Sequence, residues 1–439
     1  MNEWARPFNL GQISVPAAVI RPKDANEVAS IVKCALKHNK KVQAKAGGHS
    51  FANHGMGGED GAISVDLHHL QYVSVNSVDP SQSIRVGGGT RLGQIDEQLR
   101  PYERAIPHGA CYGIGIGGHA TVGGLGSMSR MWGTTLDHVE EVEVVTANGT
   151  IVRANGRQNS DLFFALRGAG ASFGIVTEFV MRTQRTPREV LHYSHDLQFK
   201  QFNDLVDVYF DWQTLIADPR LDPRFGSAFF FTSDGARIST MWYGTEEDMR
   251  QSGILDKLPS TGAKISVHQG DWEFSLAMNA EVESRHIPNV SNNLYSKGLG
   301  FTQADLLPKK AIADLFELLE SQHQGSGPWS IKFEAAGGAI SKTPLTATAY
   351  AHRDKFMFYQ SYSTDNMVTR NLLEKYHRRM LNSLPSNTPS TYPGFADPEL
   401  RDPQRMYWGA NLCTLEEIKT TWDPLDVFHN PQSVRLKSP

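Results

Sequence analysis

Apolar and polar residues follow one another along the chain at spacings that predict both helices and strands. After Asp24, apolar residues return every three or four positions as far as the polar residues 38–41, which predicts a helix. Two β-rich runs flank Asn148-Gly149, a pair preferred where turn residues have positive φ, and these predict a hairpin over 140–154. Further strands are expected at 41–46, 62–67, 84–87 and 173–182, with a short helix at 92–99.

The pattern changes near Arg185. Glycine becomes rarer, and longer amphipathic segments at 202–217, 309–324 and 366–384 alternate with strands at 225–232 and 346–362. This pattern is typical of an antiparallel sheet backed by helices, so the chain is predicted to be α+β. A last helix is expected at 414–421, ended by Asp423-Pro424, but periodicity alone does not place the tail, residues 407–434.

Composition excludes several classes of protein. A chain of 439 residues is long enough for two or three domains with ample core, so folding needs neither disulfides nor a metal ion. A net charge of −4 argues against a nucleic-acid partner. No run of about 18 apolar residues is present, which argues against a membrane span. The start of the chain lacks the features of a secretory signal, which indicates an intracellular protein or a mature form that has lost one.

Glycine is concentrated in one segment. Seven glycines fall within residues 113–126, just after His108 and Cys111. Such a segment offers backbone N–H groups free of side-chain obstruction, which suits a pyrophosphate and a flat cofactor, although tight turns would need the same glycines. No amphipathic helix is predicted after Gly117, which argues against a dinucleotide-binding βαβ unit. His49 and Cys111 are ambiguous alone, because a loop histidine is usually exposed or hydrogen-bonded and a lone cysteine is usually a small buried hydrophobe.

Together these segments resemble the flavin-linked oxidases of the vanillyl-alcohol oxidase type, in the berberine-bridge-enzyme-like branch that includes fungal oligosaccharide oxidases. The resemblance is carried by AKAGGHSF (44–51), HGACYGIGIGGHATVGGLG (108–126), NSDLFFALRGAGASFGIVTEF (159–179), KFEAAGG (332–338) and the tail YWGANLCTLEEIKTTWDPLDVFHNPQSV (407–434). It implies a two-part FAD-binding domain formed by residues 1–184 and 403–439, and an α+β substrate domain formed by residues 185–402.

The resemblance also implies a bicovalent FAD. His49 matches the histidine bonded to the flavin 8α-methyl group and Cys111 matches the cysteine bonded to C6; imidazole nitrogen and thiolate are the available nucleophiles toward an electron-poor flavin. The other residues expected around the FAD are Ala46, Gly47, Gly48, Ser50, Phe51, Gly115, Gly117, Gly118, His119, Gly123, Gly124, Gly126, Ile175 and Val176, with Tyr407 and Asn411 from the tail.

The reaction implied is hydride transfer from an alcohol or hemiacetal carbon, such as an oligosaccharide reducing end, to the flavin, with reoxidation by dioxygen to hydrogen peroxide. In such oxidases a tyrosine assisted by a carboxylate removes the hydroxyl proton. Glu334 matches the carboxylate, but Phe395 stands where the tyrosine is usual, and Phe51 stands at another position that is often tyrosine. Glu334 and Tyr392 are therefore the candidate catalytic residues, unless the substrate needs a different base.

Three interpretations remain open from the sequence. The first is an oxidase of oligosaccharides or similar substrates. The two phenylalanines favour a second, a tailoring oxidase of small-molecule biosynthesis on the same scaffold. The third is a flavin-bound binding protein without turnover. In all three the partner is a small molecule or an oligosaccharide, with dioxygen as the acceptor in the first two.

The three cysteines have separate expected roles. Cys34 lacks the N-terminal cysteine with which the equivalent residue pairs in secreted relatives, which fits a reducing compartment or a truncated chain. Cys111 is the expected flavin attachment site, and Cys413 has no predicted function.

Overall fold

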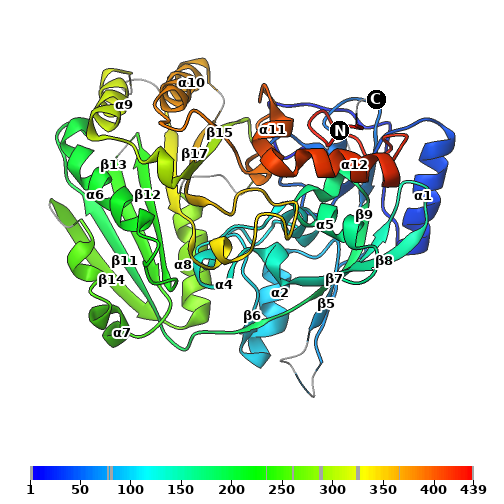
Figure 1. The fold of residues 1–439 in the computed structure, drawn as a ribbon, viewed down its shortest axis with the longest axis horizontal. Coiled ribbons are helices and arrows are strands. Elements are labelled where there is room, and N and C mark those ends of the chain that lie inside the picture. The colour runs from blue at the N-terminus through cyan, green and yellow to red at the C-terminus, as the bar shows by residue number, and fades with distance from the viewer. Residues whose placement is uncertain are drawn as a thin grey trace.

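The computed structural model describes residues 3–76, 79, 83–233, 235–259, 262–285, 290–322, 327–364 and 366–437. Two sheets lie in the part of the molecule that holds both chain ends (Figure 1). A parallel sheet has the order β1-β3-β2, and an antiparallel sheet has the order β4-β5-β9-β7-β8. Their strands are β1 (Ala18–Ile20), β2 (Val42–Lys45), β3 (Ile63–Asp66), β4 (Val73–Ser74), β5 (Ile84–Gly87), β7 (Val139–Val145), β8 (Ile151–Asn155) and β9 (Ile175–Met181).

Helices pack around these two sheets. Helix α1 begins after Asp24, whose side chain accepts a hydrogen bond from the Glu27 backbone N–H, as expected for an N-cap. The short strands β6 (Arg104–Ala105) and β10 (Gln184–Arg185) pair where the chain leaves for the other half of the molecule. The helices of this part are α1 (Ala25–Lys37), α2 (Leu92–Leu99), α3 (Ile116–Val122), α4 (Ser129–Trp132) and α5 (Ser160–Ala169).

A seven-stranded antiparallel sheet dominates the other half (Figure 1). Its order is β14-β11-β13-β12-β16-β17-β15. One face packs against α6 (Val206–Ala217), α9 (Lys309–Gln322) and α10 (Met367–Asn382) through an aromatic core, and α8 (Trp272–Ser284) lies beside β11 and β14. The strands are β11 (Val190–Leu197), β12 (Phe225–Thr232), β13 (Gly235–Trp242), β14 (Ala263–Gly270), β15 (Leu294–Thr302), β16 (Trp329–Ala335) and β17 (Lys355–Thr364); α7 is Glu246–Gln251.

The predicted α+β class is confirmed, with two corrections. The segment 113–126 does contain a helix, α3. Its glycines leave no periodic pattern of apolar residues from which a helix could be predicted. The strand expected over 346–362 begins only at Lys355. The residues before it turn back onto α5, where the Ala349 and Tyr350 N–H groups donate to the carbonyls of Phe164 and Arg167. Residues 323 and 324 of the helix expected over 309–324 lie outside the described residues.

The predicted hairpin over 140–154 is confirmed as β7 and β8, but its turn differs from the expected one. Only Gly149 has a positive φ, of 73°, and its N–H donates to the Thr146 carbonyl. No helix in the described part of the chain is long and apolar enough to cross a membrane.

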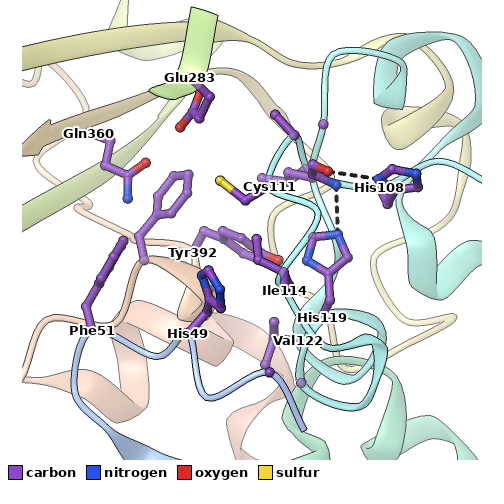
Figure 2. Close-up of a pocket in the computed structure, with 18 of the residues that line it drawn as sticks. His49, Phe51, His108, Cys111, Ile114, His119, Val122, Glu283, Gln360 and Tyr392 are labelled. Carbon is purple, nitrogen blue, oxygen red and sulfur yellow. Dashed lines mark hydrogen bonds between the residues drawn. The ribbon is translucent and has the colours of Figure 1, made fainter. Parts of the chain in front are cut away.

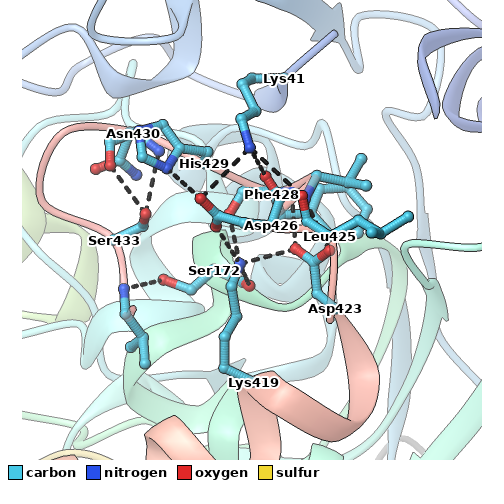
Figure 3. Close-up of polar contacts among 12 residues, drawn as sticks. Lys41, Ser172, Lys419, Asp423, Leu425, Asp426, Phe428, His429, Asn430 and Ser433 are labelled. Atoms are coloured by element: carbon cyan, nitrogen blue, oxygen red, sulfur yellow. Dashed lines mark hydrogen bonds and ion pairs between the residues drawn. The ribbon is translucent and has the colours of Figure 1, made fainter. Parts of the chain in front are cut away.

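The tail that periodicity left unplaced returns to the N-terminal half as α11 (Pro403–Trp408) and α12 (Leu412–Trp422). A buried ammonium fixes its position (Figure 3): Lys419 is fully buried and lies 2.7 Å from Asp423 Oδ2 and 2.9 Å from Asp426 Oδ1. Its Nζ also donates to the carbonyls of Ser172 and Phe428, each at 2.9 Å. Asp423 in turn accepts the backbone N–H groups of residues 427 and 428.

We expect Lys419→Met to destabilise the protein by about 3–5 kcal/mol, because removing one partner of a buried ion pair leaves uncompensated buried charge. The result would be a lower Tm in thermal unfolding followed by circular dichroism. Lys437→Met is the control, since Lys437 forms an exposed pair with Glu417 and should leave the Tm within error. Equal Tm values for the two variants would contradict a role for the Lys419 cluster in holding the tail.

Candidate functional site

A cavity of about 330 Å³ lies between the two halves of the molecule. One side is formed by two loops, residues 43–55 and 108–128. The opposite side is formed by α8 and by side chains of β12, β13, β16 and β17 (Figure 2). The cavity thus joins the glycine-rich loops to the seven-stranded sheet.

The two loops meet backbone to backbone. A Cβ atom on Gly47 would lie 2.3 Å from the Gly115 N, and one on Gly115 would lie 2.1 Å from the Gly47 N. A Cβ on Gly126 would lie 1.8 Å from the His108 carbonyl oxygen. No side chain is tolerated at these contacts, so the glycines are required for the approach of the loops.

One glycine of α3 is different. Gly118 lines the cavity, and a Cβ built on it would meet nothing within 4 Å. Beside the loops, Arg91 Nη1 is buried and has no hydrogen-bond partner within the described residues, and it lies 2.9 Å from where a Gly47 Cβ would be. The open space at Gly118, and a buried Arg91 Nη1 without a partner near Gly47, suit a phosphate-bearing cofactor with a flat ring.

His49 follows the first glycine loop and stacks on Phe8, with 4.4 Å between the ring centroids. Burial, aided by the charge of Arg91, lowers the pKa of His49 to about 4. The imidazole is therefore neutral at neutral pH, and a neutral ring nitrogen carries the lone pair that nucleophilic attack requires.

Cys111 borders the same cavity (Figure 2). Burial raises the pKa of the thiol to about 12; the carboxylate of Glu283 adds to the shift, and the ammonium of Lys332 opposes it. In the protein alone the side chain is thus a thiol, and its thiolate, the reactive form, is scarce at neutral pH.

The loop that carries Cys111 is held by two buried histidines. The Gly109 N–H donates to His119 Nε2 at 3.0 Å, and burial lowers the pKa of His119 to about 3, so this nitrogen remains an acceptor. His108 Nε2 lies 2.8 Å from Asp96 Oδ1, and this carboxylate raises the pKa of His108 although burial opposes it. The positions of these rings set the path of the chain on both sides of Cys111.

The sheet contributes a row of polar side chains to the cavity. Because side chains alternate between the faces of a strand, Lys332 and Glu334 of β16 point to the same face. Lys332 is paired in register with Phe230 on β12 and with Gln360 on β17. The Lys332 Nζ lies 3.0 Å from Glu334 Oε2 and 2.9 Å from Glu283 Oε2 of α8. All five side chains line the cavity.

Tyr392 lines the cavity as a buried acceptor. Its Oη accepts a hydrogen bond from the Gly124 N–H at 2.7 Å, and burial raises the pKa of the phenol above its usual value. The Phe395 ring packs edge-on against it, with 5.1 Å between the centroids. A phenol whose pKa is raised is harder to ionise, which argues against Tyr392 as a base.

The structure brings most of the predicted site residues together, but not all. Those that line the cavity are Ala46, Gly47, Gly48, His49, Ser50, Phe51, Cys111, Gly115, Gly118, His119, Gly126, Glu334 and Tyr392. Those that do not are Gly117, Gly123, Gly124, Ile175, Val176, Tyr407 and Asn411. Tyr407 donates to Gln432, and the Asn411 amide donates to carbonyls of residues 345, 348 and 349, so both hold the tail rather than the cavity.

Sequence reasoning missed Arg91, Glu283, Lys332 and Gln360. Lys332 could have been predicted, because it stands two residues before Glu334 and side chains two residues apart on a strand share a face. Glu283 lies about fifty residues earlier on a helix, and only the tertiary fold brings it to the cavity. Within the described part of the chain, no group of three or more His, Cys, Asp or Glu side chains is arranged to hold a metal ion.

Comparison with known proteins assigns the class of this fold and site. A model of the FAD binding domain matches residues 16–155, and a model described as berberine and berberine like matches residues 391–435. The chain is therefore an FAD-linked oxidoreductase with an FAD-binding domain.

Individual relatives agree over the whole length. FAD-linked oxidoreductase sorD of Penicillium rubens is 36% identical, over 98% of this chain and 92% of that protein. The xylooligosaccharide oxidase from Myceliophthora thermophila C1 in complex with xylobiose matches with a TM-score of 0.91 and 28% identity, over 99% and 95%. The glucooligosaccharide oxidase from Acremonium strictum, with 6-S-cysteinyl, 8α-N1-histidyl FAD, matches with a TM-score of 0.89 and 27% identity, over 99% and 95%. The chain belongs to the berberine-bridge-enzyme-like family of FAD-linked oxidoreductases.

We expect Gly118→Val to lower FAD incorporation without unfolding the protein. The added side chain would fill the open space at Gly118, and a clash of about 1–3 kcal/mol would weaken FAD binding roughly 10- to 100-fold. The ratio of flavin to protein absorbance reports the loss, and circular dichroism reports the fold.

Gly156→Val is the matched control, because Gly156 is exposed, also has open space around its Cβ position and lies outside the cavity. Normal flavin content in Gly118→Val would show that the cofactor does not occupy the open space at Gly118.

Proposed function

We propose that this protein is a covalently flavinylated oxidase that oxidises an alcohol or hemiacetal carbon of its substrate and reduces dioxygen to hydrogen peroxide. The observation that carries the proposal is that a neutral histidine, His49, and a cysteine, Cys111, border one cavity in a chain of this family. A similar protein, the glucooligosaccharide oxidase, has an FAD bonded to both a cysteine and a histidine. When bound, FAD accepts a hydride and passes the electrons to dioxygen.

In this proposal each residue has a defined task. His49 and Cys111 bond to the flavin and fix its position. The loop around Gly47 and the helix α3, which carries Gly118, hold the phosphates and the ring. Glu334 accepts the proton of the substrate hydroxyl, since its carboxylate lines the cavity and Tyr392 is engaged with the Gly124 N–H. We also retain, as a proposal, the division into an FAD-binding domain (1–184 and 403–439) and a substrate domain (185–402).

Two substrate classes are supported by different observations. Oligosaccharides are favoured by the similar proteins named for xylo- and glucooligosaccharides. A small molecule of a biosynthetic pathway is favoured by the aromatic wall, where Phe51 packs edge-on against Tyr362 at 5.7 Å between centroids and Phe395 stands at the usual tyrosine position.

We expect acid-precipitated protein to stay yellow because of the covalent flavin. Flavin should also remain bound in His49→Ala through Cys111 and in Cys111→Ala through His49, and only the double variant should lose it. Mass spectrometry of the denatured protein gives the number of attached flavins. A colourless wild-type pellet would remove the covalent attachment from the proposal.

The pH dependence of attachment separates the two bonds. For apoprotein made under riboflavin limitation and mixed with FAD, attachment in His49→Ala should quicken about tenfold per pH unit between about pH 7 and 9, because the thiolate fraction rises tenfold per unit below the thiol pKa. Attachment in Cys111→Ala should stay constant over the same range, because a histidine with a pKa of about 4 is already neutral. The same slope in both variants would contradict these protonation states.

Peroxide release tests the reaction. The panel consists of cello-, xylo-, chito- and malto-oligosaccharides beside phenolic and alkaloid alcohols.

Glu334→Gln should slow flavin reduction by roughly 10²–10⁴, the usual contribution of a general base, while Glu317→Gln on the exposed side of α9 should not. An unchanged rate would reject Glu334 as the base, and silence across the panel would favour a flavin-bound protein without turnover.

A further inference from the structure

We propose that Glu283, Lys332 and Glu334 form a subsite for a protonated amine that the substrate carries next to an oxygen function. This inference rests on the proposed oxidase function and names the substrate class of the same cavity. The ligand is an amino sugar or an amino alcohol, since both present an ammonium beside a hydroxyl or carbonyl oxygen.

The first step is the charge of the cluster. Two carboxylates share one ammonium, at 2.9 and 3.0 Å from Lys332 Nζ, so the cluster carries a net charge of −1. The two neighbouring carboxylates raise the pKa of Lys332, which therefore stays cationic and does not act as a base. The other lysine of the cavity, Lys45, is paired with Asp66 at 3.3 Å and lies on the loop side.

The second step is which groups face the cavity. The side chains of Glu334 and Glu283 are 20% and 14% exposed, whereas that of Lys332 is 11% exposed. Each carboxylate binds Lys332 through Oε2, and within the described residues neither Oε1 accepts a hydrogen bond. Each carboxylate therefore keeps one oxygen that could accept a hydrogen bond from a ligand.

The third step is an unpartnered donor beside the cluster. Gln360 is only 3% exposed, lies next to Lys332 in the strand register and points into the cavity (Figure 2). Its Nε2 is buried and has no partner within the described residues, which is costly unless a ligand supplies an acceptor. The carboxylates can accept a hydrogen bond from a ligand and Gln360 can donate one to it. The site therefore suits a ligand whose donor and acceptor groups lie close to each other.

The surroundings make charge decisive. The surface that lines the cavity is mostly apolar, and Phe230, Met241, Val282 and Tyr362 contribute to it. In such a weakly polar environment an unbalanced negative charge is expensive, and a ligand cation removes the imbalance whereas an anion doubles it. The same feature that attracts an amine thus rejects carboxylate-bearing sugars.

The test measures binding to the holoenzyme by perturbation of the flavin spectrum, which needs no turnover. Three matched ligands are compared: glucosamine oligomers, their N-acetylated forms and glucose oligomers; a second arm uses amino alcohols and their N-acetylated forms. We expect each amine to bind at least about tenfold tighter than its N-acetylated form. Its affinity should fall as the pH rises through the pKa of the ligand amine. If the glucosamine oligomers bind more tightly than the amino alcohols, the ligand is an amino sugar; the reverse order identifies an amino alcohol.

Glu283→Gln makes the cluster neutral and should abolish this preference, and Glu283→Asp should restore part of it. Glu273→Gln is the matched control, because Glu273 lies on the same helix but outside the cavity, where it pairs with Arg100. Equal affinities for amine and N-acetylated ligands in the wild type, or tighter binding of a uronate-ended oligomer, would overturn the subsite even if Glu283→Gln failed to fold. A colourless acid precipitate and no peroxide would instead count against the proposed function, and the binding comparison would still decide the subsite.

Discussion

The cavity depends on one close approach, the contact between the backbones of Gly47 and Gly115. A Cβ atom at either position would lie only 2.1–2.3 Å from a backbone nitrogen of the other loop, which is well inside van der Waals contact, so a side chain there would force the loops apart. This contact brings together two segments more than sixty residues apart in sequence, one with His49 and one with Cys111. The buried pairing of His108 with Asp96 and the bond from Gly109 to His119 keep the second segment in place. A loop mutation that relaxes this packing would therefore separate His49 from Cys111 before it disturbed either side chain.

The opposite wall is positioned by a different kind of constraint, strand register. Lys332 pairs with Phe230 and Gln360, and Glu334 stands two residues further on the same face. A slip of one residue would turn this whole row into the aromatic core under α6, α9 and α10. That core contains Tyr209, Phe229 and Phe333, whose burial makes the slip unfavourable. The polar row that faces the cavity is thus held in position by apolar packing on the far face of the sheet.

These two constraints explain what the sequence could predict. Segments with clear periodicity, such as α1, α2 and the β7–β8 hairpin, depend on local sequence, and the Asp24 cap of α1 could be predicted from its residue type. Helix α3 was missed because two of its seven residues, Gly117 and Gly118, and both flanking residues, Gly115 and Gly123, are glycines, which are poor helix formers. The tail depends on the fully buried Lys419, whose partners include the Ser172 carbonyl almost 250 residues away. His49, Cys111 and Glu334 were found through family resemblance, whereas Glu283 comes from a helix with no motif and needed the fold.

The two walls meet at Cys111, where charged side chains of the opposite wall, Glu283 and Lys332, act on the thiol of the loop side. Glu283 raises the pKa of this thiol and Lys332 lowers it, so the cluster first influences how readily the thiolate forms. In the proposed holoenzyme the sulfur is bonded to the flavin and no longer titrates, so that influence ends. The net charge of −1 then has only the substrate to act upon. In the proposed enzyme Glu283 and Lys332 would therefore influence cofactor attachment first and, together with Glu334, substrate selection afterwards.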